Sequence, residues 1–71
     1  MITEIGIISG EIWNFLDKEG DTTLKQLVER LGKPHDLILM SLGWLAREGH
    51  VLLKHTDDIY TVSLRKKELE A

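Results

Sequence analysis

The side chains that could hold a metal gather near residues 50–58, but their spacing does not suit a metal site. His50 and His55, with the adjacent carboxylates Asp57 and Asp58, are the candidate ligands. The two histidines are separated by an odd number of positions, so on a regular strand they point to opposite faces. Zinc needs about three or four convergent ligands, and the sequence contains no cysteine to supply a thiolate. We therefore expect no bound metal.

Catalytic chemistry finds equally little support. Ser9, Ser41 and Ser63 fall in two helical patterns and one strand pattern, without the sharp strand-to-helix turn that exposes a nucleophilic serine. No pair of carboxylates marks a cleft for acid–base work. The six glycines lack the spacing of a phosphate-binding loop. We expect a protein that is not an enzyme and that uses no cofactor and no small-molecule substrate.

Size and charge narrow the class of partner. The chain has 71 residues with 9 Lys and Arg against 12 Asp and Glu, a formal charge of −3. A chain of this size forms one domain with little room for a deep cavity. Because binding to phosphates depends on cations, the negative charge counts mildly against a nucleic-acid partner. The sequence shows no basic leader and no apolar run of about 20 residues, so we expect a cytoplasmic protein with no membrane partner.

Apolar residues recur at helical spacing in three segments of the chain. The expected helices span residues 3–19, 23–31 and 34–48. Thr23 followed by Gln26 forms a capping-box pattern, and Pro34 suits the first position of a helix. Gly32 and Lys33 alone connect the second and third helices, which is typical of a helix-turn-helix unit.

After Gly49 the apolar period changes from that of a helix to that of a strand. A two-residue turn at Asp57 and Asp58 would place Val51 opposite Leu64 in a hairpin; a four-residue loop is the alternative, because this turn lacks glycine. Either version puts the same residues on one face: Val51, Leu53, His55, Tyr60, Val62 and Leu64. The expected fold class is α+β, mainly α, with one domain over residues 1–64 and a charged tail over 65–71.

Three helices followed by a hairpin resemble the winged helix-turn-helix arrangement. The segments SGEIWNFL (9–16), TLKQLVERLG (23–32) and LGWLAREG (42–49) are similar, in this order and spacing, to a family of small uncharacterised prokaryotic winged helix-turn-helix domains. The resemblance implies a fold and a DNA-binding ancestry. It implies no catalytic residue and no established ligand.

Sequence-specific DNA binding, as a transcriptional regulator, is the alternative function that this resemblance favours. The outward side of helix 34–48 and the hairpin wing would then make the contacts. Bases are read mostly by Arg, Lys, Asn and Gln, whereas this side holds Asp36 and apolar residues, and two aspartates occupy the wing tip. The possible DNA contacts are Lys33, His35, Arg47 and Lys54.

A protein interface is the first hypothesis, because the outward side of helix 34–48 is apolar. The expected interface residues are Leu39, Met40, Gly43, Trp44, Ile7 and Phe15. A small domain gains stability by sharing its core, so we expect a homodimer or a complex with another protein, in a role that includes transcription regulation. The alternative is that Met40 and Trp44 pack under Met1, Ile2 or the tail residue Leu69.

Two glycines of the first expected helix indicate a close helix contact. Gly6 and Gly10 lie four positions apart, and each costs about 1 kcal/mol relative to alanine in a helix interior. Tight packing against another helix would compensate for that cost.

Overall fold

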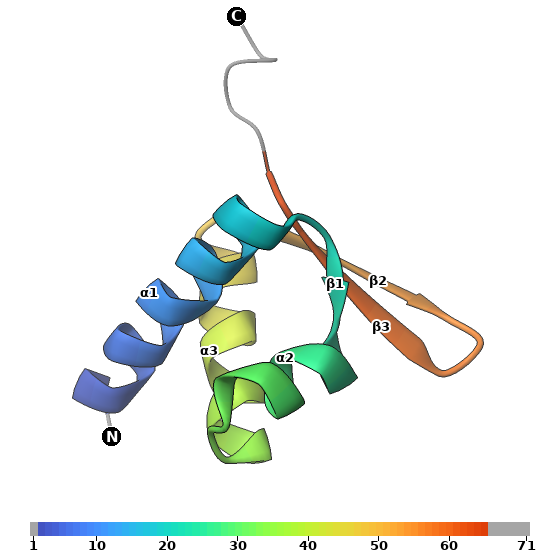
Figure 1. Ribbon diagram of the computed structural model, residues 1–71. Coiled ribbons are helices and arrows are strands. Elements are labelled where there is room, and N and C mark those ends of the chain that lie inside the picture. The colour runs from blue at the N-terminus through green and yellow to red at the C-terminus, as the bar shows by residue number, and fades with distance from the viewer. Residues whose placement is uncertain (1, 66–71) are drawn as a thin grey trace, which may run out of the picture.

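The computed structural model describes residues 2–65, which form a three-helix unit with a hairpin projecting from it (Figure 1). The elements in chain order are α1 (Ile2–Glu19), β1 (Thr22–Thr23), α2 (Leu24–Leu31), α3 (His35–Arg47), β2 (Val51–Thr56) and β3 (Ile59–Leu64). The strands form one antiparallel sheet in the order β1-β3-β2. This is the winged-helix architecture that the sequence predicts, and its fold class is confirmed.

Local signals set the helix ends close to where they are expected. The Oγ of Thr23 accepts a hydrogen bond from the N–H of Gln26 at 3.1 Å, which satisfies one of the unpaired donors at the start of α2. Gly32 ends α2 in the left-handed region at φ 66°, a conformation that glycine adopts without steric cost. The third helix begins at His35, with Pro34 as its N-cap and Glu48 as its C-cap.

The core lies where α1 packs against α3, and α2 and the base of the sheet close it. It consists of Ile8, Ile12, Leu16, Leu27, Ile38, Leu42, Leu45, Val51 and Val62. Ser41 is fully buried among them, and its hydroxyl donates to the carbonyl of Ile5 at 3.4 Å. Each of α1 and α3 therefore buries one stripe of residues and leaves its other sides available.

The short strand β1 was not expected from the sequence. Thr22 pairs with Val62 and Thr23 pairs with Thr61. The segment after α1 therefore forms backbone pairing with β3, the middle strand of the sheet. The hydroxyl of buried Thr22 also donates to Oε1 of Gln26 at 2.9 Å. Thr23 thus pairs in the sheet and caps α2 at the same time.

The expected hairpin register is confirmed, with Val51 opposite Leu64 and Thr56 opposite Ile59. The turn has two residues, Asp57 at φ 51° and Asp58 at φ 64°, so the four-residue alternative is wrong. On the hairpin face that carries these residues, Val51 and Val62 are buried, whereas Leu53, His55 and Tyr60 are exposed. They are exposed because β2 and β3 extend past the helices (Figure 1).

Replacing Asp58 by glycine should stabilise the domain. A residue with a Cβ is strained in the left-handed region, and glycine at the second turn position is the favoured choice for this hairpin. We expect Asp58→Gly to raise the free energy of unfolding by about 1 kcal/mol in urea titrations. Asp58→Ala is the control, because it removes the charge and retains the Cβ. An equal gain from Asp58→Ala would assign the effect to repulsion from Asp57 instead.

Candidate protein-interaction surface

The outward part of α3 carries two rows of exposed apolar residues. Met40 and Trp44 form one row, one helical turn apart, and Trp44 is 50% exposed. Leu39 and Gly43 form a second row beside it, and Leu39 is 45% exposed. The structure therefore places all four of the expected α3 interface residues at the surface of the described chain.

The two interface residues expected on α1 lie elsewhere. Phe15 is half-buried and packs against the core, with the guanidinium of Arg30 5.3 Å from its ring centroid. The expectation that Phe15 extends an exposed patch is therefore wrong. Ile7 is exposed, but it lies about 100° around α1 from its neighbour Gly6, on a different side of the helix.

A shallow groove between α1 and α3 occurs where sequence reasoning did not place a site. It has a volume of about 280 Å³ and is lined by Gly6, Ser9, Gly10, Trp13, Trp44, Leu45 and His50; we name it the tryptophan groove. Both tryptophans of the chain line it, one from each helix, and Trp13 is 40% exposed. The signal that could have found Trp13 is its spacing of three from Gly10 and seven from Gly6, which puts all three on one side of α1.

Ser9 is among the residues that line this groove, and its hydroxyl is buried within the chain. Ser9 is 4% exposed, and its Oγ has no hydrogen-bond partner within residues 2–65. Leaving a buried hydroxyl unpaired costs about 1–3 kcal/mol, so such groups are rare in native structures.

The helix glycines contact nothing that explains them within the described residues. A Cβ built on Gly6, Gly10 or Gly43 would meet no atom within 4 Å beyond its own helix backbone and chain neighbours. None of the three has a positive φ, so backbone conformation does not require glycine there either. The close helix contact expected at Gly6 and Gly10 is therefore absent from residues 2–65.

The four residues considered for DNA contact come from the segment before α3, from both ends of α3 and from β2. Nζ of Lys33 lies 3.9 Å from Oε2 of Glu11 on α1, and Nη1 of Arg47 lies 3.6 Å from Oε2 of Glu48. His35 is at the start of α3, whereas Arg47 is at its end, and Lys54 is on β2. Two of the four cations or potential cations are thus next to a carboxylate, which weakens their attraction for phosphate.

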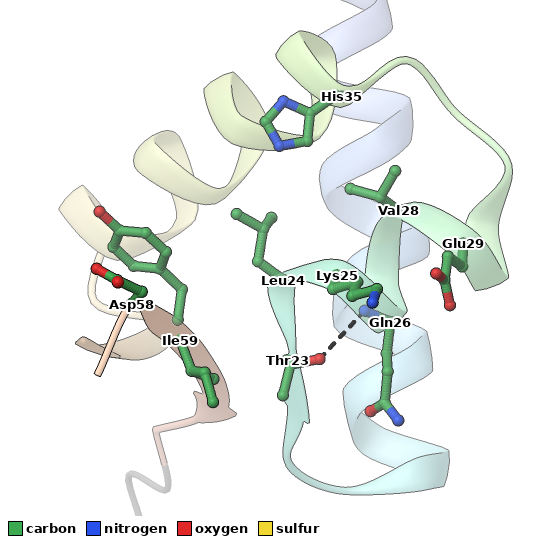
Figure 2. Close-up of a pocket in the computed structure, with 10 residues that line it drawn as sticks. Thr23, Leu24, Lys25, Gln26, Val28, Glu29, His35, Asp58 and Ile59 are labelled. Atoms are coloured by element: carbon green, nitrogen blue, oxygen red, sulfur yellow. Dashed lines mark hydrogen bonds between the residues drawn. The ribbon is translucent and has the colours of Figure 1, made fainter. Parts of the chain in front are cut away.

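A second, larger groove of about 690 Å³ separates α2 and the start of α3 from the wing (Figure 2). It is lined by Thr23, Leu24, Lys25, Gln26, Val28, Glu29, His35, Asp58, Ile59 and Tyr60. Figure 2 shows Leu24 and His35 directed toward the same space, and Glu29 directed away from it. One lysine and two carboxylates line this groove, so its charge does not favour a phosphate ligand.

Residues 2–65 contain no cluster of three or more His, Asp or Glu side chains arranged to hold a metal ion. Among the described helices, none combines the length and the apolar character needed to cross a bilayer.

Comparison with known protein families identifies the fold independently. The sequence profile described as Winged helix-turn-helix domain (DUF2582) matches residues 1–64. The chain belongs to this family. Comparisons with curated proteins and with solved structures gave no match. Winged helix-turn-helix domains are typically non-catalytic and commonly bind DNA. Membership of the family therefore establishes the fold, but it does not identify the binding partner of this domain.

The open surroundings of the helix glycines lead to a stability prediction. Gly10→Ala and Gly43→Ala should each raise the free energy of unfolding of the monomer by about 1 kcal/mol, because alanine is the better helix former and its methyl group meets nothing. Urea denaturation followed by circular dichroism, at the lowest practical protein concentration, measures this. A loss of stability in either variant would mean that the glycine is in close contact within its own chain.

Proposed function

We propose that this winged helix-turn-helix domain acts through protein–protein contacts, and that its basic assembly is a homodimer. The observation that carries the proposal is the exposed apolar surface formed by both rows of α3 and by Trp13 of α1. Tryptophan and methionine are enriched at the centres of protein interfaces, where charged residues are depleted. A surface of this composition favours contact with another protein over contact with water.

The size of the domain supports the same proposal. Nine buried hydrophobic residues make up the core of the described chain, and domains of this length stay marginally stable on such a core alone. Joining the exposed rows of two copies would remove further apolar area from water, at about 25 cal/mol per Å². Oligomerisation is one of the common ways in which small domains gain stability.

DNA-binding transcription regulation through α3 and the wing is the second candidate, and membership of the family is what favours it. The charges of this chain oppose it. The outward side of α3 offers Arg47, which lies next to Glu48, together with Asp36 near its start. The wing tip presents two aspartates, where a cation would be needed to approach the DNA backbone. A role in transcription would then rest on protein contacts.

Charge placed on both rows of α3 should dissociate the dimer. We expect wild-type protein at roughly 50 µM to be dimeric in sedimentation equilibrium, and the double variant Leu39→Glu with Met40→Glu to be monomeric, because two buried carboxylates would oppose association. The matched control is Leu52→Glu with Leu53→Glu, which puts the same charges on exposed apolar residues of β2. A wild-type protein that remains monomeric at this concentration would contradict the homodimer.

A titration with duplex DNA separates the two functions. We expect no chemical-shift changes in α3 or the wing when random-sequence duplex is added to labelled protein at about 50 mM salt, where electrostatic binding is strong. Shifts confined to α3 and the wing that disappear as the salt concentration rises would instead support the DNA-binding regulator.

A further inference from the structure

We propose that the outer edge of β2 is a self-association site, where β2 of a second copy adds in the antiparallel direction and extends the sheet. This contact goes beyond the proposed homodimer, because it uses the wing instead of α3. The sheet order β1-β3-β2 places β2 at an edge, and within residues 2–65 no strand pairs with its outer side. A molecule with both contacts can form assemblies larger than a dimer.

The hairpin register shows which backbone groups of β2 face the open edge. In an antiparallel pair, hydrogen-bonded and non-hydrogen-bonded residues alternate along each strand. The N–H of Arg65 donates to the carbonyl of His50 at 3.0 Å, so the even-numbered residues of β2 are those that bond to β3. The N–H and C=O groups of Val51, Leu53 and His55 therefore point away from β3, at the spacing that an added strand requires.

The edge of β2 lacks the features that keep other strands from adding. Natural edge strands are protected by proline, by bulges or by several charges. β2 contains no proline and pairs with β3 without a bulge, and Lys54 is the only lysine, arginine or acidic residue within it. Leu52 is 52% exposed and Leu53 is 44% exposed, so both faces of the strand hold apolar area that an added strand would cover.

Overlap and charge select one antiparallel register. With Leu53 opposite Leu53 of the second copy, Val51 lies opposite His55, and every outward-facing residue of β2 gains a hydrogen-bonded partner. Lys54 then lies opposite Leu52, along which its aliphatic stem can pack. A register centred on Leu52 leaves fewer hydrogen-bonded pairs, and one centred on Lys54 sets like charges opposite each other.

Charge complementarity between the two ends of β2 identifies the partner as a second copy. In the selected register, Asp57 of the wing tip lies opposite Gly49 of the other chain. The guanidinium of Arg65 is next to that position, because its Nη1 lies 3.7 Å from a Cβ built on Gly49. The acidic tip of each wing, where Asp58 follows Asp57, therefore meets a cation at the base of the other wing. The two-fold symmetry of the contact repeats this pairing at both ends.

The other charges at the base of β2 do not oppose the contact. Nη1 of Arg47 lies 3.6 Å from Oε2 of Glu48, so these two side chains are neutral as a pair. Glu48 is the only acidic residue in the segment 47–56. Protonation of His50 would add a further cation at this end. The base of the wing is thus the more basic end, and the tip is the acidic one.

A variant without the proposed α3 contact isolates the edge contact. Strand addition buries less area than a whole helix face, so it should be the weaker of the two associations. We expect Leu39→Glu with Met40→Glu, monomeric at about 50 µM, to be dimeric in sedimentation equilibrium at about 1 mM. Wild-type protein should form species larger than a dimer over the same range.

Amide hydrogen exchange in this double variant locates the contact. We expect the N–H groups of Val51, Leu53 and His55 to exchange at least about twofold more slowly at about 1 mM than at about 50 µM. The N–H groups of Leu52 and Lys54 should keep their rates, because they already bond to β3. Dimerisation that slows exchange on α3 and leaves the odd-numbered residues of β2 unchanged would overturn the edge contact.

Two substitutions at one position separate the backbone contact from the side chain. Proline at position 53 removes an N–H that points to the open edge and leaves the hydrogen bonds to β3 in place. In the double variant, Leu53→Pro should abolish dimerisation up to about 1 mM. Leu53→Ala retains the N–H and should weaken dimerisation less. Circular dichroism checks that both proteins remain folded, and a dimer that persists in folded Leu53→Pro would contradict strand addition.

An exchange of charges tests the register. In the double variant, Arg65→Glu should raise the dissociation constant at least about fivefold, because it sets like charges opposite each other at both ends. Adding Asp57→Lys should restore most of the affinity. Residues 57 and 65 lie at opposite ends of the hairpin within one chain, so such recovery requires that they meet between chains. Failure of Asp57→Lys to rescue Arg65→Glu would overturn the register and the charge pairing.

The outcomes separate this inference from the proposed function. A double variant that stays monomeric at about 1 mM overturns the edge contact and leaves the α3 homodimer standing. A wild-type protein that is monomeric at about 50 µM contradicts the homodimer. The edge contact then predicts that wild-type protein itself dimerises by about 1 mM, with slower exchange at the odd-numbered residues of β2.

Discussion

The packing of α1 against α3 is the contact on which the remaining structure depends. Ile8, Ile12 and Leu16 of α1 form one buried stripe, and it meets a single stripe of α3 made of Ile38, Leu42 and Leu45. The wing is joined to this core through Val51 and Val62. The described residues 2–65 are too few to surround either helix, so part of the surface of both helices remains exposed. A domain of this size buries only a limited part of its helix surfaces, and the part that stays exposed is what is available for function.

Much of the fold follows from local sequence signals. The helix period, the Thr23 cap and the left-handed Gly32 act within a few residues, and they place α2 and its neighbours closely. The hairpin register follows from its turn. In contrast, β1 has two residues, too few to show alternation, and its partner β3 lies far along the chain. The exposure of Leu53 and Tyr60 also depends on where the helices end in space, which strand alternation does not encode.

The candidate site shows the same division between local and long-range information. A helical wheel places Leu39, Met40 and Trp44 on the outside of α3, because their angle to the buried stripe is a local property. On α1, Phe15 and Trp13 flank the stripe on opposite sides, and the sequence contains nothing that tells which flank another helix covers. In the structure Phe15 lies beneath Arg30 of α2, and Trp13 stays exposed beside Gly10. The glycines at positions 6 and 10 are visible in the sequence, but no contact within residues 2–65 explains them.

Family membership and surface chemistry answer different questions about this winged helix-turn-helix domain. The fold supplies an exposed third helix and a wing, and either element can meet DNA or protein. Binding DNA requires cations that stay hydrated until they meet phosphate, whereas binding protein requires apolar area that is readily dehydrated. These demands compete for the same few positions of α3, and here apolar side chains occupy them. The wing tip is also unsuited to DNA, because the carboxylates of Asp57 and Asp58 repel phosphate. These two residues hold a backbone conformation that glycine would adopt with less strain.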